Sequence, residues 1–416
     1  MLSMSANANV AVLMSPEMVM ERGLVSNKNY MDIDFPRGHI GVKSVNAELV
    51  DERGNPLPLD EAYLHHWVIQ RYITGVRDAN FSIVRNSGIC DTAVTQYFGL
   101  GAETRKTATD IPDPYGIQVG DPAGIPQGYK EGWLLNVHAI DTRGTEDKMG
   151  CAECRCDLYN VTRHESVVAR PLGYKGGVLC CPDQSRCRLK QGFHGDKRSI
   201  YLRYTVKYMD WDSSSMIPLK IYILEVTDVW TKADQSKGIQ DSHHCAVEYD
   251  IESCDLKNDK NGCIVSTNVS VSLPSGGDVI YGVSHQHTGA AGTTLYGEGG
   301  RVVCSSKPIY GEGNEVGNES GYIVGMTTCY PSPSQPIRIY EGEKLTLVSN
   351  YSSLQTHTGV MTLFYLLLDD SSPQPRALKM TTVPKFIWPV VLLGVVLVLV
   401  VSKGKTRRTD GYEAML

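Results

Sequence analysis

The chain has 416 residues, which is too long for one ordinary domain and suits two. Hydrophobic residues make up 42% and charged residues 21%, a composition that excludes a chain disordered throughout. The formal net charge is −6, so we expect no nucleic-acid partner. The 22 Tyr, 40 Gly and 20 Pro favour β-structure with many turns over a helical bundle.

Residues 1–25 lack the features of an export signal. They contain a short apolar stretch at 10–14, but no positively charged start and no convincing cleavage site. We therefore treat 1–34 as a separate N-terminal segment with two interpretations. Either the start of the sequence is incomplete or miscalled, which we favour, or the body is cytosolic and held by a tail anchor.

Short alternating or β-branched runs recur between residues 40 and 368, separated by clusters of Gly, Pro, Asn and Asp. No long segment with helical periodicity occurs ahead of residue 386. This pattern predicts an all-β fold of two jelly-roll or β-sandwich domains in tandem, at 35–195 and 196–370. A stalk rich in Ser, Pro and Thr is expected at 371–385.

The run 386–402 is apolar and uncharged, and it reaches the short end of the length that crosses a bilayer. A buried strand would be shorter, so we expect one C-terminal transmembrane helix. Basic residues follow it directly, which predicts a cytosolic tail at 403–416. In that tail Tyr412 and Met415 fit a tyrosine-based sorting signal.

Five N-glycosylation sequons and twelve cysteines indicate that the body is lumenal or extracellular, on the plasma membrane or in the endomembrane system. The even number of cysteines is consistent with complete disulfide pairing, with the connectivity open. The cysteines between 151 and 187 also have spacings that resemble a zinc site, but disulfides are the better interpretation in an exported protein. The predicted glycosylated residues are Asn80, Asn160, Asn268, Asn318 and Asn350.

Histidines gather in three strand-like segments: His65-His66, His138 and His285-x-His287. Strand side chains alternate between faces, so His285 and His287 project together and could bind one ion. The adjacent His65 and His66 could share an ion only where the strand bends. Imidazole suits Zn, Cu, Fe and Ni, and a thioether selects Cu(I).

The spacing of these residues repeats. His66 precedes His138 by 138 − 66 = 72 residues, and His287 precedes Met361 by 361 − 287 = 74 residues. Each predicted domain would therefore contain a histidine pair followed by one further ligand.

These motifs, with Thr356-His357-x-Gly ahead of Met361, resemble those of the copper type II ascorbate-dependent monooxygenases. Those enzymes hydroxylate peptidylglycine or dopamine, and they have two jelly-roll domains with one copper in each. The resemblance implies an electron-transfer copper at His65, His66 and His138. It implies an oxygen-binding copper at His285, His287 and Met361. The stretch between Thr356 and Met361 is shorter than in those enzymes, so His357 is the alternative to Met361.

The same resemblance implies hydroxylation of a C–H bond with oxygen, two coppers per chain and ascorbate as the reductant. The substrate, a small molecule or a peptide, stays open. One alternative is a cupin-type metal site, but Glu298 comes late after His287 for that pattern. Another is a non-catalytic cell-surface or endomembrane protein on the same scaffold.

Four further motifs are Phe35-Pro-Arg-Gly-His-Ile-Gly-Val-Lys-Ser, Leu64-His-His-Trp-Val, Gly276-Gly-Asp-Val-Ile-Tyr-Gly-Val-Ser-His-Gln-His and Asn350-Tyr-Ser-Ser. With these motifs, and over nearly its full length, the sequence resembles the plant stress up-regulated nodulin family (Nod-nineteen type). The resemblance implies a stress-related plant protein and implies no particular reaction.

Overall fold

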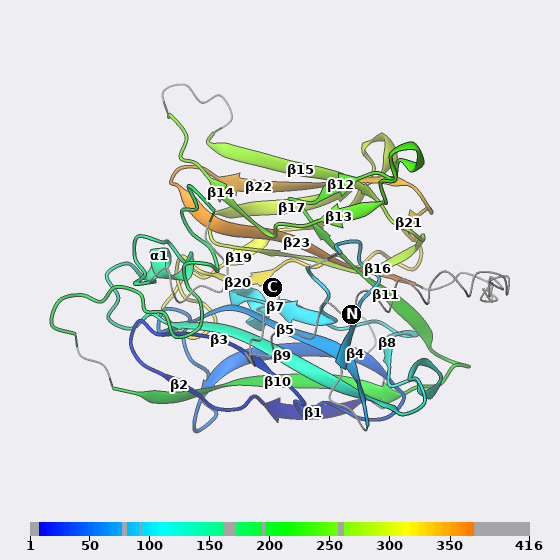
Figure 1. Cartoon of the computed structure of the whole chain (residues 1–416), viewed down its shortest axis with the longest axis horizontal. Helices are drawn as coiled ribbons and strands as arrows, with labels where there is room; N and C mark the ends of the chain where they lie inside the picture. Colours follow the sequence, from blue (N-terminus) through cyan, green and yellow to red (C-terminus); the bar gives the residue numbers. More distant parts are fainter. Residues whose placement is uncertain are drawn as a thin grey trace, which may run out of the picture. The chain divides into compact units, whose positions relative to one another are not determined.

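The computed structural model describes residues 8–76, 81–91, 93–161, 171–193, 196–256 and 262–369 (Figure 1). These residues are mostly β-structure, which confirms the predicted all-β class. Among them the one α-helix is α1 (Lys148–Ala152), and four short 3-10 helices connect strands. They are η1 (Ala102–Arg105), η2 (Pro122–Gly124), η3 (Gln235–Lys237) and η4 (Glu298–Gly300).

The predicted stalk, membrane span and tail, 371–416, lie outside the described residues, as do Tyr412 and Met415. Within the described ranges, no helix has the length and apolar character needed to cross a bilayer.

A ten-stranded sheet, called here the long sheet, organises the fold. Strand β10 (Arg198–Asp210) follows the boundary predicted at 195/196, yet it pairs with β4 (Ile40–Asp51). The strands of the two predicted domains therefore share this sheet, and residues 1–371 group into one compact unit. From one edge to the other, the strands of the long sheet are β1 (Asn9–Met14), β10, β4, β8 (Tyr115–Val119), β11 (Ile217–Glu225), β23 (His357–Asp369), β16 (Gly277–Gln286) and β21 (Arg338–Ile339). Two more strands pair outside this order, β2 (Met18–Met20) with β10 and β14 (Glu248–Ile251) with β23.

Two further sheets pack on the long sheet. The five-stranded sheet contains β3 (Val25–Tyr30), β9 (Tyr129–Asp141), β5 (Ala62–Gly75) and β6 (Phe81–Val84), with β7 (Phe98–Leu100) on β5. The four-stranded sheet contains β15 (Ile264–Ser272), β22 (Lys344–Ser352), β17 (Ala290–Tyr296) and β18 (Val302–Ser306). Two ribbons complete the fold, β12 (Val229–Thr231) with β13 (Ser242–His244) and β19 (Pro308–Tyr310) with β20 (Ile323–Met326).

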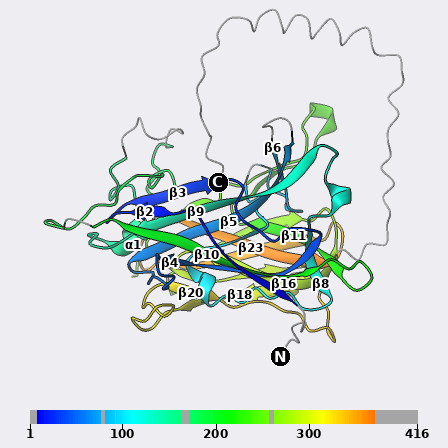
Figure 2. The same ribbon diagram turned by 90° about the horizontal axis from the view of Figure 1, so that it is seen from below.

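The sheets form stacked layers. In Figure 1 the four-stranded sheet lies above β23, the five-stranded sheet lies in the middle, and β10 and β1 lie below it. Seen from below, β5, β9, β10 and β23 overlap, as stacked layers do (Figure 2). One apolar core joins side chains of β4, β5, β9, β10 and β16, and a second lies between the four-stranded sheet and β11, β16 and β23. The five-stranded sheet is thus covered by the long sheet, and its buried face meets β16.

The N-terminal segment is part of this architecture. Residues 10–14 belong to β1, which pairs antiparallel with β10. Met18 and Met20 of β2 are fully buried in the main core. This part of the segment expected at 1–34 therefore belongs to the long sheet, and β3 belongs to the five-stranded sheet.

All twelve cysteines form disulfides, which confirms the predicted complete pairing. Three of the disulfides lie in residues 147–187, called here the cysteine-rich segment. They are nested: Cys151–Cys187 encloses Cys154–Cys181, which encloses Cys156–Cys180. Glycine close packing holds that segment against β23, since a Cβ on Gly359 would lie 2.4 Å from the Cα of Gly177. The pairs are Cys90–Cys245, Cys151–Cys187, Cys154–Cys181, Cys156–Cys180, Cys254–Cys263 and Cys304–Cys329.

Candidate metal centre

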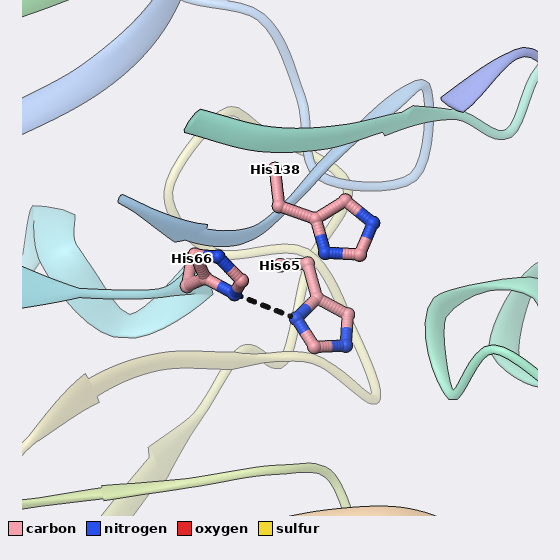
Figure 3. A group of neighbouring side chains, drawn as sticks. All are labelled: His65, His66 and His138. Atoms are coloured by element: carbon pink, nitrogen blue, oxygen red, sulfur yellow. Dashed lines mark hydrogen bonds between the residues drawn. The ribbon is translucent and has the colours of Figure 1, made fainter. Parts of the chain in front are cut away.

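The first three predicted ligands lie together on neighbouring strands. His66 of β5 stands opposite His138 of β9, and the register between the two strands shifts between Leu64 and His66. This irregularity is the bend that adjacent histidines need to face the same space. The ligand nitrogens of His65, His66 and His138 all lie within 4.8 Å of one another (Figure 3). We call these residues the histidine trio.

The second predicted pair lies beside the trio. His285 is near the end of β16 and His287 follows that strand, with their ring centroids 5.2 Å apart. The ring of His287 lies 4.8 Å from that of His65, centroid to centroid. The two sets of histidines, expected in separate domains, therefore form one group of five, called here the histidine cluster.

Most of the cluster is closed to solvent. His138 is 0% exposed, His65 1% and His287 3%, whereas His66 is half-buried. Six ring nitrogens in the cluster are buried without a hydrogen-bond partner among the described residues. Buried polar atoms are nearly always hydrogen-bonded, so six exceptions in one place require a physical explanation. The six are His65 Nε2, both nitrogens of His138, His285 Nε2 and both nitrogens of His287.

Neighbouring hydrogen bonds determine which nitrogen of His66 is free. The side-chain amide of Asn136 donates to the Lys28 carbonyl and to Asn27 Oδ1, so its own oxygen faces His66. His66 Nε2 donates to that oxygen at 2.7 Å. In neutral His66 the lone pair is therefore on Nδ1, the atom that faces His65.

The distance between these two rings suits a shared ion. His65 Nδ1 and His66 Nδ1 are 3.3 Å apart. Two nitrogens that each bind a tetrahedral ion at about 2.0–2.1 Å lie about 3.3–3.4 Å from each other. The pair is therefore already spaced as two ligands of one ion would be.

The electrostatics of the cluster favour neutral imidazoles. Burial lowers the pKa of His66 to about 4, although its bond to Asn136 opposes the shift. Burial, followed by the neighbouring imidazoles, lowers the pKa values of His65, His138 and His287 well below their usual range. Neutral imidazole is the form that binds metal ions.

Two buried glutamates orient histidines, one in the cluster and one on β23. Glu103 in η1 accepts from His285 Nδ1, with 2.6 Å between the atoms, and Glu103 is 1% exposed. This bond leaves His285 Nε2 free to face an ion, as carboxylates behind metal-binding histidines do. Glu153 makes the same contact with His357 Nδ1 at 2.6 Å. The sequence analysis missed both glutamates, because neither belongs to a histidine motif.

Glycines beside the histidines make room for them. A Cβ on Gly101 would lie 2.5 Å from the His65 carbonyl oxygen and 2.8 Å from His285 Cε1. A Cβ on Gly289 would lie 2.4 Å from His357 Nε2, and Gly289 has a φ of +92°. The glycine in His285-x-His287-x-Gly289 is thus explained by the position of His357.

The two alternative ligands on β23 have different surroundings. His357 is buried beside Gly289, whereas Met361 is buried in the main apolar core. The Tyr351 hydroxyl accepts from the His287 backbone N–H and donates to the Met361 carbonyl, which links the two backbones. Either residue as a ligand stays a prediction.

The cysteine-rich segment covers His138. The sulfur atoms of Cys154 and Cys181 and a ring nitrogen of His138 lie within 4.8 Å of one another. Because the two sulfurs are joined in a disulfide, they are not thiolate ligands. The same segment contributes Glu153, which lines a cavity of about 660 Å³ with Met149, Arg155 and Thr358.

The predicted glycosylation residues vary in exposure. Asn160 and Asn268 are exposed, and Asn318 and Asn350 are half-buried. Asn80 lies outside the described residues.

Comparisons with known proteins give one clear result. A family model described as stress up-regulated Nod 19 matches residues 6–371. No curated protein matches the sequence. Among solved structures, the chain is similar to PBCV-1 VP54 fitted into a reconstruction of the virophage Sputnik, with 8% identity and a TM-score of 0.29. That match covers 89% of this chain and 95% of the other chain. It is also similar to a chain of the T13 viral particle of IBDV, with 9% identity, a TM-score of 0.17 and coverage of 87% and 70%.

Proposed function

We propose that this chain, which belongs to the stress up-regulated Nod 19 family, binds copper in the histidine cluster. The observation that supports this most is the set of six buried imidazole nitrogens without hydrogen-bond partners among the described residues. The donor set fits copper and also zinc, since imidazole suits both. Copper is the expectation from the monooxygenase-like motifs, and when bound it supplies one-electron redox chemistry.

Metal content tests this proposal. The full-length chain, purified in detergent, is loaded with copper or zinc and analysed for metal per chain after removal of excess ions. We expect tightly retained copper in the wild type and the loss of at least one ion per chain in His138→Ala. The matched control is His243→Ala, because His243 is also buried but its Nδ1 is bonded to Asp228. Retention of no metal, or an equal loss in His243→Ala, would overturn the proposal.

The finer function that we infer is hydroxylation of a C–H bond with oxygen and ascorbate. In that reaction R–H, O₂ and ascorbate give R–OH, H₂O and dehydroascorbate, so ascorbate supplies both electrons and both protons. Glu103 and Glu153 would orient their histidines, and the cavity beside Glu153 has room for a small molecule or peptide side chain. Ascorbate-dependent oxygen uptake that requires copper and is absent from His138→Ala would support this function.

A structural metal is the second candidate, and burial favours it. Closed sites with every position taken by protein ligands are typical of structural ions, whereas catalytic sites keep an open position. His138 at 0% and His65 at 1% exposed resemble the closed kind. Retained copper, with no ascorbate-dependent oxygen uptake in the presence of any member of a panel of small molecules and peptides, would favour the non-catalytic function.

We also propose that the protein is exported and anchored by one span at 386–402, with 403–416 in the cytosol. Six disulfides support an oxidising compartment, and Asn160 and Asn268 are exposed sequon asparagines. Treatment with an N-glycosidase should increase the mobility of the chain on a gel. Alkaline extraction should leave the chain in the membrane fraction, and its release would contradict the anchor.

A further inference from the structure

We propose that the histidine cluster is a single dinuclear centre. The trio would hold one ion, and His285 and His287 would hold a second ion in the same buried space. The inference rests on the proposed metal binding. It differs from the expectation of two separate sites, one in each domain.

The number of donors exceeds the need of one tetrahedral ion. A neutral imidazole has one lone pair, so the cluster offers five nitrogen ligands where a tetrahedral ion takes four. His66 is restricted to Nδ1 by Asn136, and His285 is restricted to Nε2 by Glu103. His138 and His287 can bind through either nitrogen, since the described residues leave both without a partner. In His65 the Nε2 atom is without a partner, whereas Nδ1 faces His66 Nδ1.

The donors also divide in space. Among the described residues, the group of imidazoles whose nitrogens lie within 4.8 Å of one another contains only the trio, without His285 and His287. His285 and His287 therefore do not complete the coordination of the ion in the trio, although their own rings are 5.2 Å apart. A second ion between these two rings satisfies nitrogens that the first ion leaves without a partner.

Direct ring contact joins the two positions. The rings of His65 and His287 are nearly perpendicular, at 87°, with 4.8 Å between their centroids. The rings of His65 and His138 are stacked at 4.4 Å. Ions bound to neighbouring rings of this kind would lie close together, so their unpaired electrons would interact.

Charge is balanced differently at the two positions. The neutral amide of Asn136 lies behind His66, whereas the buried carboxylate of Glu103 lies behind His285. A buried carboxylate is costly without a nearby positive charge, and a cation on His285 Nε2 supplies one. The carboxylate also fixes the tautomer and orientation of its histidine, so the second position gains affinity from Glu103.

The test compares copper content with electron spin. The full-length chain in detergent is loaded with Cu(II), and total copper is measured beside the spin count from electron paramagnetic resonance. We expect two coppers per chain and a spin count clearly below two, or a dipolar-broadened signal with a half-field transition. In His287→Ala we expect one copper per chain with one full spin. His243→Ala should match the wild type.

The outcomes separate this inference from the proposed function. One copper per chain, or two coppers with two full unbroadened spins, would overturn the dinuclear centre and leave metal binding intact. Retention of neither copper nor zinc would overturn both. If His287→Ala does not fold, Glu103→Gln keeps the side-chain volume and should weaken the second ion about 10- to 100-fold. Equal affinity for both ions in Glu103→Gln would contradict the role assigned to Glu103.

Discussion

His138 and His243 are both buried, yet their ring nitrogens are bonded in different ways. His243 on the β12–β13 ribbon bonds Asp228 at 2.6 Å and stacks on Trp230. His138 on β9 is 0% exposed, and neither of its nitrogens makes a well-aligned hydrogen bond among the described residues, although the Cys181 backbone lies near its ring. Burial alone therefore does not distinguish a ligand from a packed histidine. The missing partners do, and they occur where four other imidazoles converge.

Metal removal should separate the two histidines most clearly. A ligand present at about 1,000 times its Kd stabilises the folded state by about 4 kcal/mol, so chelation should lower the Tm of the wild type. His138→Ala should keep only the part of this Tm shift that an ion at His285 and His287 contributes. His243→Ala leaves the buried Asp228 without its histidine partner, which should lower the free energy of unfolding by about 1–3 kcal/mol. The chelator should still lower the Tm of this variant as much as it lowers that of the wild type. Calorimetry with and without chelator measures these Tm shifts. If the chelator leaves the wild-type Tm unchanged, His138 is no more a metal ligand than His243.

Two disulfides of similar loop length allow a second comparison. Cys154–Cys181 spans 27 residues beside His138, and Cys304–Cys329 spans 25 residues in the second apolar core. Replacing either pair by alanines should destabilise the chain by about 3–4 kcal/mol, because loop-closure entropy depends on loop length. Only the first replacement should weaken metal binding. Urea unfolding and metal titration of both variants check this, and equal loss of affinity would argue against a specific role of Cys154–Cys181.

Gly101 should tolerate no side chain, since a Cβ there would meet both His65 and His285. We expect Gly101→Ala to lose about 1–3 kcal/mol of stability from overpacking and to bind metal less tightly. Gly124→Ala is the matched control, because a Cβ at Gly124 has nothing within 4 Å. If both variants unfold at the same urea concentration, Gly101 is not required for ring packing.

At neutral pH the smallest expected effect is that of His66 titration, which grows only as the pH of the apoprotein solution falls. Its pKa falls from 6.5 to about 4 on folding, so the unfolded chain binds the extra proton between these values. Stability should therefore fall as pH decreases from 6.5 to about 4, by up to about 1.4 kcal/mol per pH unit for this group. In His66→Gln the free energy of unfolding should lose this part of its dependence on pH. An unchanged slope in urea unfolding across that pH range would show that His66 titrates normally.

Sequence periodicity and composition were sufficient for the coarse fold and for complete cysteine pairing. They also identified all five members of the histidine cluster, because His-His and His-x-His in strands are recognisable motifs. The requirement for a bend at His65-His66 was stated from strand geometry alone, and β5 has a register shift there.

The joining of the trio to His285 and His287 could not be read from the sequence. It depends on how the long sheet brings β16 against the five-stranded sheet, a contact between residues more than 140 positions apart. Glu103 and Glu153 were missed for a related reason. Each is a single carboxylate in a turn or short helix, and only tertiary packing places it behind a histidine.

The pairing of β10 with β4 has a consequence for biosynthesis. At about 5–20 residues per second, about 8–30 s pass between the synthesis of β4, which ends at Asp51, and that of β10, which ends at Asp210. During this interval β4 lacks β10, and at first also β8, so it presents an open edge to other chains. A nascent chain cut short ahead of β10 would keep that edge permanently. Recombinant expression of the N-terminal half alone should therefore yield aggregates.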